Sequence, residues 1–210
     1  MYQTHPRTKG STGYPDKILA TEHFRDNRYW GAGWKAMPAD LSQPALGMRS
    51  LRLLDDLAAA GYRKRLLGEV DVFQVDSTHE LYAHMNINYV RADTLPSFDR
   101  YGELLNAMDR GEFFVSTGEV LLPEVRWERQ SGRIRLAAQA TWRFPLAFAE
   151  IVWGDGEKVH RTQLDLTSTR AFGSKEFQWE LAAPGWRWAR LAVWDVAGNG
   201  AFTNPEWREQ

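Results

Sequence analysis

The stretch that decides the fold is residues 132–156, GRIRLAAQATWRFPLAFAEIVWGDG. In RIRLAAQA and again in FAEIVW, side chains of different character alternate, so that successive residues face opposite sides of a strand. The Gly-Asp-Gly at 154–156 is a hairpin-type turn that follows the second run. This stretch therefore predicts two short strands in which successive side chains take opposite faces.

The same rhythm of short strands and turns continues on both sides of this stretch, from about Val120 to Trp207. We expect about seven strands in roughly 90 residues, which is the sequence pattern of a β-sandwich. The expected strands are 120–129, 132–142, 147–156, 157–166, 175–182, 187–198 and 201–207.

The residues before 118 follow a different pattern, in which helices alternate with strands. Residues 46–62 predict an amphipathic helix with Gly61 as its C-cap, and 97–111 predict a second helix with Ser97 as its N-cap. Strands are expected at Val70–Val75 and at 112–118. The fold class is therefore α+β, with an α/β segment at 1–117, a β-sandwich domain at 118–210, and the boundary near Thr117–Glu119.

Composition restricts the classes of function. The chain has 26 basic and 27 acidic residues, so nothing favours a nucleic acid partner, and no polybasic or apolar segment favours a membrane. The polar first residues do not resemble a signal peptide, and we expect a soluble chain whose compartment stays unknown. The absence of cysteine excludes disulfides and thiolate chemistry. The ten tryptophans belong either to a sandwich core or to a carbohydrate-stacking face.

The segment Asp71–Asn88 holds the strongest candidates for chemistry. Its side chains Asp76, His79, Glu80 and His84 are of the types that hold zinc, manganese or iron. The spacing His79-Glu80-x-x-x-His84 is one residue longer than the HExxH zinc motif, so the two imidazoles would diverge on a helix. A solvated polar loop is the competing interpretation.

A weaker set of candidates lies near the start of the chain. His5 precedes Pro6, which favours an extended, strand-end conformation at the histidine. Arg7 and Lys9 could bind an anionic group of a substrate, or they could be ordinary surface charges.

Several motifs resemble one family. The run DRGEFFVSTGEV at 109–120 is similar to the junction that follows the barrel of PHP-type (polymerase and histidinol phosphatase) metallohydrolases, in the carbaryl-hydrolase-like branch with a C-terminal β-sandwich. The ending AVWDVAGNGAFTNPEW at 192–207 resembles the closing motif of that branch. VDSTH at 75–79 and NYVR at 88–91 lie where the branch has related motifs, and His5-Pro6 resembles the late His-Pro of PHP barrels.

The resemblance implies a distorted β/α barrel that binds divalent metal (Zn, Mn or Fe) and hydrolyses phosphoester or ester-type bonds. By position, His5 and Asp76 would be metal ligands, and His79 would be a ligand or a proton-transfer group. The chain departs from the family in lacking the His-x-His pair, and it has Glu119 where the junction usually has proline. It therefore resembles the last third of such an enzyme, and with at most two or three of the ligands present we expect the isolated chain to bind metal weakly at best.

Two functions follow from these observations. In the first, the chain is the C-terminal portion of a PHP-like hydrolase, with little or no activity alone, whose partners are a small-molecule substrate and the missing barrel part. In the second, it is a non-catalytic binding module whose tryptophan-rich sandwich recognises carbohydrate or a protein. A homo-oligomer that completes the site is a further expectation, because a partial barrel exposes strand edges.

Overall fold

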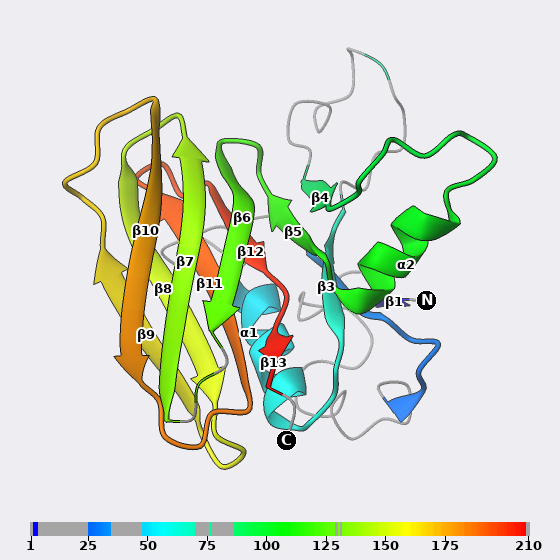
Figure 1. Cartoon of the computed structure of the whole chain (residues 1–210), viewed down its shortest axis with the longest axis horizontal. Helices are drawn as coiled ribbons and strands as arrows, with labels where there is room; N and C mark the ends of the chain where they lie inside the picture. The colour runs from blue at the N-terminus through cyan, green and yellow to red at the C-terminus, as the bar shows by residue number, and fades with distance from the viewer. Residues whose placement is uncertain are drawn as a thin grey trace.

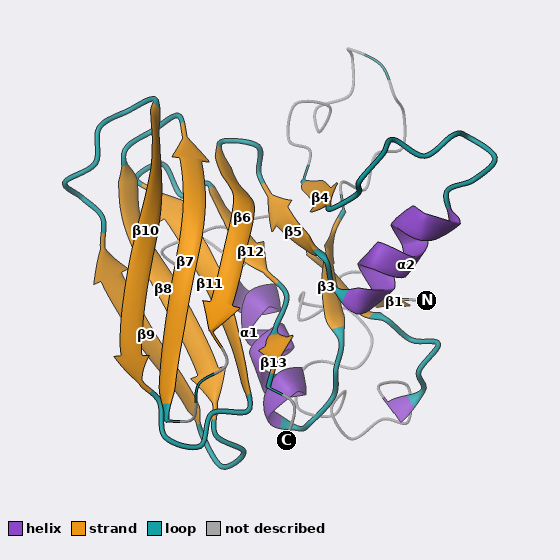
Figure 2. Ribbon diagram, viewed as in Figure 1, coloured by secondary structure: helices purple, strands orange, loops and turns teal. Residues whose placement is uncertain are grey.

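The computed structural model describes residues 2–3, 25–34, 48–69, 76, 86–128, 130 and 132–208. These residues are mostly strand, with helices at Met48–Ala59 (α1) and Gly102–Arg110 (α2) (Figure 2). The first strands are Tyr2–Gln3 (β1), Gly31–Trp34 (β2), Arg65–Gly68 (β3), Ile87–Val90 (β4) and Phe113–Ser116 (β5). They are followed by Val120–Glu128 (β6), Arg133–Trp142 (β7), Leu146–Gly154 (β8), Val159–Asp165 (β9), Gly173–Ala182 (β10), Trp188–Asp195 (β11), Gly200–Thr203 (β12) and Glu206–Trp207 (β13). Within the described ranges, no helix has the length and apolar character needed to cross a membrane.

Two antiparallel sheets pack face to face and confirm the predicted sandwich (Figure 1). One sheet has the order β10-β7-β6, and the other has the order β4-β5-β12-β11-β8-β9, with β13 also paired to β11. The alternation in β7 is as predicted, because Ile134, Leu136 and Ala138 are buried between the sheets while Arg133 is exposed. The strand predictions from residue 120 to residue 198 therefore match the structure to within a few residues at each end, whereas the single strand expected at 201–207 is two short strands, β12 and β13.

Strand β11 is the central strand of the larger sheet, and both of its faces are covered. Leu191 and Val193 face the sandwich core, whereas Ala192 and Trp194 belong to a second core on the opposite face. Every residue of β11 is buried. Apart from Arg190 and the terminal Asp195 its residues are apolar, which is the expected pattern for a strand that is covered on both sides.

Helix α1 and a small parallel sheet, β1-β2-β3, build the second core. The helix prediction is confirmed, since Leu51, Leu54 and Leu57 are buried on one face of α1. Gly61 has a φ of 83° and its amide donates to the carbonyl of Ala58, so it ends the helix as predicted. The larger sheet therefore has the β10-β7-β6 sheet on one face, and α1 with the small parallel sheet on the other.

Four charged side chains attach α1 to the larger sheet. Asp55 of α1 is fully buried and accepts hydrogen bonds from Arg190 of β11, one of them at 2.8 Å from Nη2. Arg190 also donates to Glu150 of β8 at 3.0 Å, and Arg161 of β9 lies 2.6 Å from Asp55. The two acids and two bases balance in charge, which is how a buried ionic cluster is tolerated.

Strands β4 and β5 connect the two predicted parts. β5 pairs with β12, so the hydrogen bonds of the larger sheet continue across the predicted boundary at 117–119. The turn between β5 and β6 is fixed by Ser116, whose hydroxyl donates to the carbonyl of Val120 and accepts from the amide of Gly118. Gly118 has a φ of 99°, a conformation that favours glycine. The division into two independent domains stays a prediction.

The start of α2 and the position of the strand before Asp76 differ from the sequence prediction or lie beyond its test. Ser97 is not the N-cap of α2; the helix begins at Gly102, and the Ser97 hydroxyl instead donates to Asp99 within a preceding turn. Gly111 ends α2 as predicted, with a φ of 79°. The strand expected at Val70–Val75 lies outside the described residues, and the strand observed in this region is β3.

Candidate functional site

Of the candidate residues from the sequence, Asp76 alone lies in the described part of the chain, where it is partly buried. The others fall outside the described residues; they are His5, Arg7, Lys9, His79, Glu80 and His84. Among the described residues, no three side chains of the metal-binding types lie together. The described residues that lie next to these candidates in the chain belong to the small parallel sheet and to β4.

The three strands of the parallel sheet share one carboxyl edge. Tyr2 pairs with Gly31, and Gly31 pairs with Arg65, so β1, β2 and β3 run in the same direction and end at the same edge. In sequence, His5 is the second residue after β1, and Glu69 is the first residue after β3. Side chains at the carboxyl ends of parallel strands are the usual source of catalytic groups in α/β folds.

Glu69 is a carboxylate at this edge that the sequence reasoning missed. Its side chain lies over Gly33 of β2, where an added Cβ would overlap the carboxylate. One of its oxygens, Oε1, is inaccessible to solvent. Glu69 was overlooked because the strand was expected to begin at Val70. The short run Leu66-Leu67-Gly68 before Glu69 was the available signal, since it is an apolar strand that ends in a glycine and an acid.

The end of β3 is held by asparagine side chains from the larger sheet. The Asn88 side chain accepts from the amide of Gly68 at 2.8 Å and donates to its carbonyl at 2.9 Å. Asn86 donates to the carbonyl of Glu69 at 2.9 Å. The backbone on both sides of the Glu69 Cα is therefore fixed by groups outside the parallel sheet.

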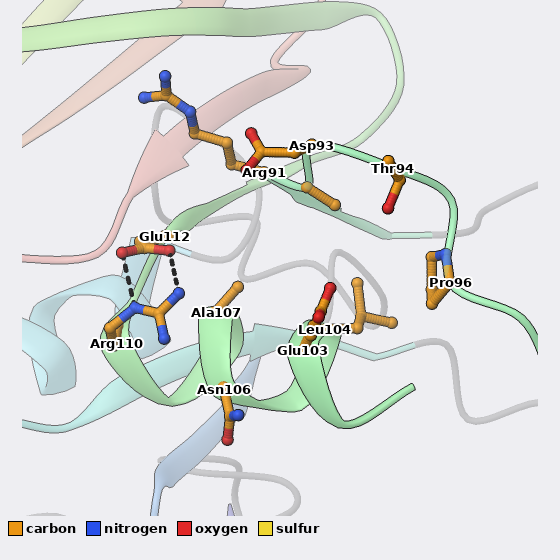
Figure 3. Close-up of a pocket in the computed structure, with 11 residues that line it drawn as sticks. Arg91, Asp93, Thr94, Pro96, Glu103, Leu104, Asn106, Ala107, Arg110 and Glu112 are labelled. Carbon is orange, nitrogen blue, oxygen red and sulfur yellow. Dashed lines mark hydrogen bonds and ion pairs between the residues drawn. The ribbon is translucent and has the colours of Figure 1, made fainter. Parts of the chain in front are cut away.

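A separate hollow lies between α2 and the segment after β4, with a volume of about 480 Å³ (Figure 3). An ion pair, Arg110–Glu112, lies in its lining. Arg110 donates two hydrogen bonds of 2.7 Å to Glu112, which lowers the pKa of that carboxyl, and the guanidinium of Arg91 points away from α2. The three carboxyls among its described lining residues, those of Asp93, Glu103 and Glu112, do not form a cluster of the kind that holds a metal ion.

The tryptophans of the sandwich do not form a stacking face. Of the six tryptophans from Trp142 to Trp194, five are buried and Trp179 is half-buried. The buried ones are Trp142, Trp153, Trp186, Trp188 and Trp194. A carbohydrate-binding function would therefore have to use other side chains.

His160 has a structural role in the sandwich. Its ring stacks on Trp153 at 3.9 Å between centroids, and its Nε2 lies 2.7 Å from Asp155. Asp155 also accepts from the backbone amides of Glu157 and Lys158 in the turn between β8 and β9. The pKa of Asp155 is lowered, first by the Lys158 amide and then by His160, as expected for a carboxylate that caps a hairpin.

Comparison with known proteins adds no further assignment. The sequence matches no model of a known protein family, and a search of the curated proteins finds no significant relative.

Proposed function

We propose that this chain is the C-terminal portion of a PHP-like metal-dependent hydrolase of phosphoester or ester-type bonds, with little or no activity on its own. The observation that carries the proposal is the order of β1, β2 and β3. These strands follow one another in sequence, lie side by side and run parallel, and α1 connects β2 to β3. Such an arrangement is the repeating unit of a β/α barrel, in which active sites lie at the carboxyl ends of the strands.

The metal site proposed here combines carboxylates and imidazoles. His5, Asp76 and His79 are the proposed ligands, and the position of Glu69 at the same edge supports it as a further carboxylate donor. Oxygen and imidazole donors together suit zinc, manganese or iron. A metal bound there would lower the pKa of a coordinated water toward neutrality.

The remaining candidates would serve the substrate. Arg7 and Lys9 follow His5 closely in sequence, and their positive charges would bind the anionic group of a phosphoester. Glu80 and His84 follow His79 closely in sequence and would contribute polar contacts to the substrate. His79 itself is the side chain proposed to move a proton, because its ordinary pKa lies near neutral pH.

Low activity of the chain alone follows from the small number of ligands. A catalytic metal site needs several converging protein groups, and the sequence has no His-x-His pair. Further strands of a barrel, or a second copy of the chain, would supply the missing groups.

The test measures metal binding by the purified chain, with Zn²⁺ or Mn²⁺ alone as the probe. We expect His5→Ala and Asp76→Ala each to weaken binding by about tenfold or more, as the loss of a ligand should. Glu157→Ala is the control, because this exposed residue lies in the turn between β8 and β9, far along the chain from the site.

Hydrolysis is measured in parallel with p-nitrophenyl phosphate and p-nitrophenyl acetate, with and without a chelator. Rapid turnover by the isolated chain would contradict the low activity that we propose. Metal binding that is absent, or that is unchanged in both ligand variants, would contradict the proposed site.

A further inference from the structure

Strand β3 is hydrogen-bonded differently on its two edges. One edge pairs with β2 in a regular parallel ladder, from Gly31↔Arg65 to Trp34↔Gly68. On the other edge, side-chain amides of the larger sheet take the place of a neighbouring strand. Buried backbone amides and carbonyls need such partners, because a polar group without one is costly to remove from water.

These side-chain contacts are concentrated at the carboxyl end of β3. Asn88 meets both the amide and the carbonyl of Gly68, and Asn86 meets the carbonyl of Glu69. A third asparagine, Asn204, accepts from the amide of Leu66 at 2.8 Å, two residues earlier. Asn86 and Asn88 therefore bind the backbone of Gly68 and Glu69, where the strand ends.

The close approach of the strand end to the larger sheet depends on Gly68. A Cβ at this position would come within 2.8 Å of Val115 Cγ1 and 3.2 Å of Asn86 Cβ. With no side chain there, the backbone lies near enough for Asn88 to form both of its hydrogen bonds. β2 on one side and the asparagines on the other thus fix the direction in which the Glu69 side chain leaves the backbone.

We propose that Asn86 and Asn88 are positioning residues that hold the Glu69 carboxylate at the carboxyl edge for metal binding. This inference rests on the proposed function. It also gives the antiparallel sheet a part in the site, because Asn86 and Asn88 lie beside and within β4, at one edge of that sheet. Residues beside and within the larger sheet would then orient Glu69, a metal-binding side chain of the α/β half.

The experiment compares Asn88→Ala with Asn204→Ala. Both variants remove a side-chain amide that bonds the backbone of β3, but Asn204 acts at Leu66, away from Glu69. Affinity for Zn²⁺ or Mn²⁺ is measured by calorimetry, and the stability of the metal-free chain by urea unfolding. We expect both variants to lose stability, and Asn88→Ala alone to lose about 10- to 100-fold in metal affinity.

A merely structural role predicts a different result. In that case, metal affinity would fall equally in Asn88→Ala and Asn204→Ala, or would change in neither, and the inference would be overturned. Asn86→Ala should follow Asn88→Ala in affinity, because it frees the carbonyl of Glu69.

A metal-free measurement separates this inference from the proposed function. Amide hydrogen exchange of the unliganded chain should show about tenfold faster exchange at Gly68 in Asn88→Ala, with Gly68 unchanged in Asn204→Ala. If the wild-type chain binds no metal, the proposed function fails even when this exchange result is obtained. If wild-type binds metal and Gly68 exchanges equally in both variants, the positioning by Asn88 fails alone.

Discussion

Replacement of Asp55 by alanine tests the buried ionic cluster that attaches α1 to the larger sheet. Asp55 and Arg190 are both fully buried, and the carboxylate also pairs with Arg161. The change leaves two guanidinium groups near one carboxylate, that of Glu150. Removal of one member of a buried ion pair typically costs 3–5 kcal/mol, because the partner charge remains desolvated. We therefore expect Asp55→Ala to lower the free energy of unfolding by about 3–5 kcal/mol.

The assay is urea unfolding, followed by circular dichroism and by tryptophan fluorescence. Arg161→Ala is a graded control, since Arg161 is 34% exposed and should cost about 1 kcal/mol or less. The double variant Asp55→Leu with Arg190→Met removes two of the three buried charges and leaves the third, Glu150, paired with Arg161, so it should lose less stability than Asp55→Ala. A loss below about 1 kcal/mol in Asp55→Ala, or a double variant less stable than the single one, would refute this reasoning.

Three further predictions concern other positions. Gly33→Ala should displace the Glu69 carboxylate and lower the free energy of unfolding, measured in urea, by about 1–3 kcal/mol. Gly102→Ala is the control, because a Cβ there has no atom within 4 Å, and its free energy of unfolding should change little. Burial raises the pKa of Tyr29 to about 12 from an ordinary value of 10.0, so the folded state keeps its proton longer than the unfolded state does. Stability should consequently fall as the pH rises from 10 to 12, and Tyr29→Phe should lose less over that range when urea midpoints are compared; equal losses would exclude Tyr29 as a cause. Phe172 is 85% exposed with a φ of 55°, so Phe172→Asn should raise the thermal midpoint by relieving about 0.5–1 kcal/mol of backbone strain, and an unchanged or lower midpoint would argue against strain there.

The sequence was informative where a pattern is local. The alternation in β7, the short strands separated by turns and the leucine face of α1 depend on residues close together in the chain, and the structure has these elements where they were expected. Gly61 and Gly111 were recognisable as helix ends for the same reason, because a glycine after an apolar stripe tolerates the left-handed conformation.

Long-range partners left no such pattern. From sequence alone, Asp55 has the character of a surface acid on α1, because its partner Arg190 lies 135 residues further along the chain. Strand β3 is only four residues long, and the apolar run after it was a stronger signal, so the strand was expected at Val70–Val75. The metal ligands proposed from the resemblance stay predictions, since of these only Asp76 lies among the described residues.

Three asparagine side chains join the α/β half of the chain to the sandwich half. A three-stranded parallel sheet with one helix has little core of its own, and sheets of this type are normally covered on both faces. Here β3 receives from Asn204, Asn86 and Asn88 the hydrogen bonds that a fourth strand would otherwise supply. The Asn204 of the closing Thr-Asn-Pro run thus has an architectural role, which is to attach the end of the sandwich to the α/β half. Because Asn88 acts where a catalytic carboxylate would be needed, the same kind of contact that joins the halves also orients the proposed site.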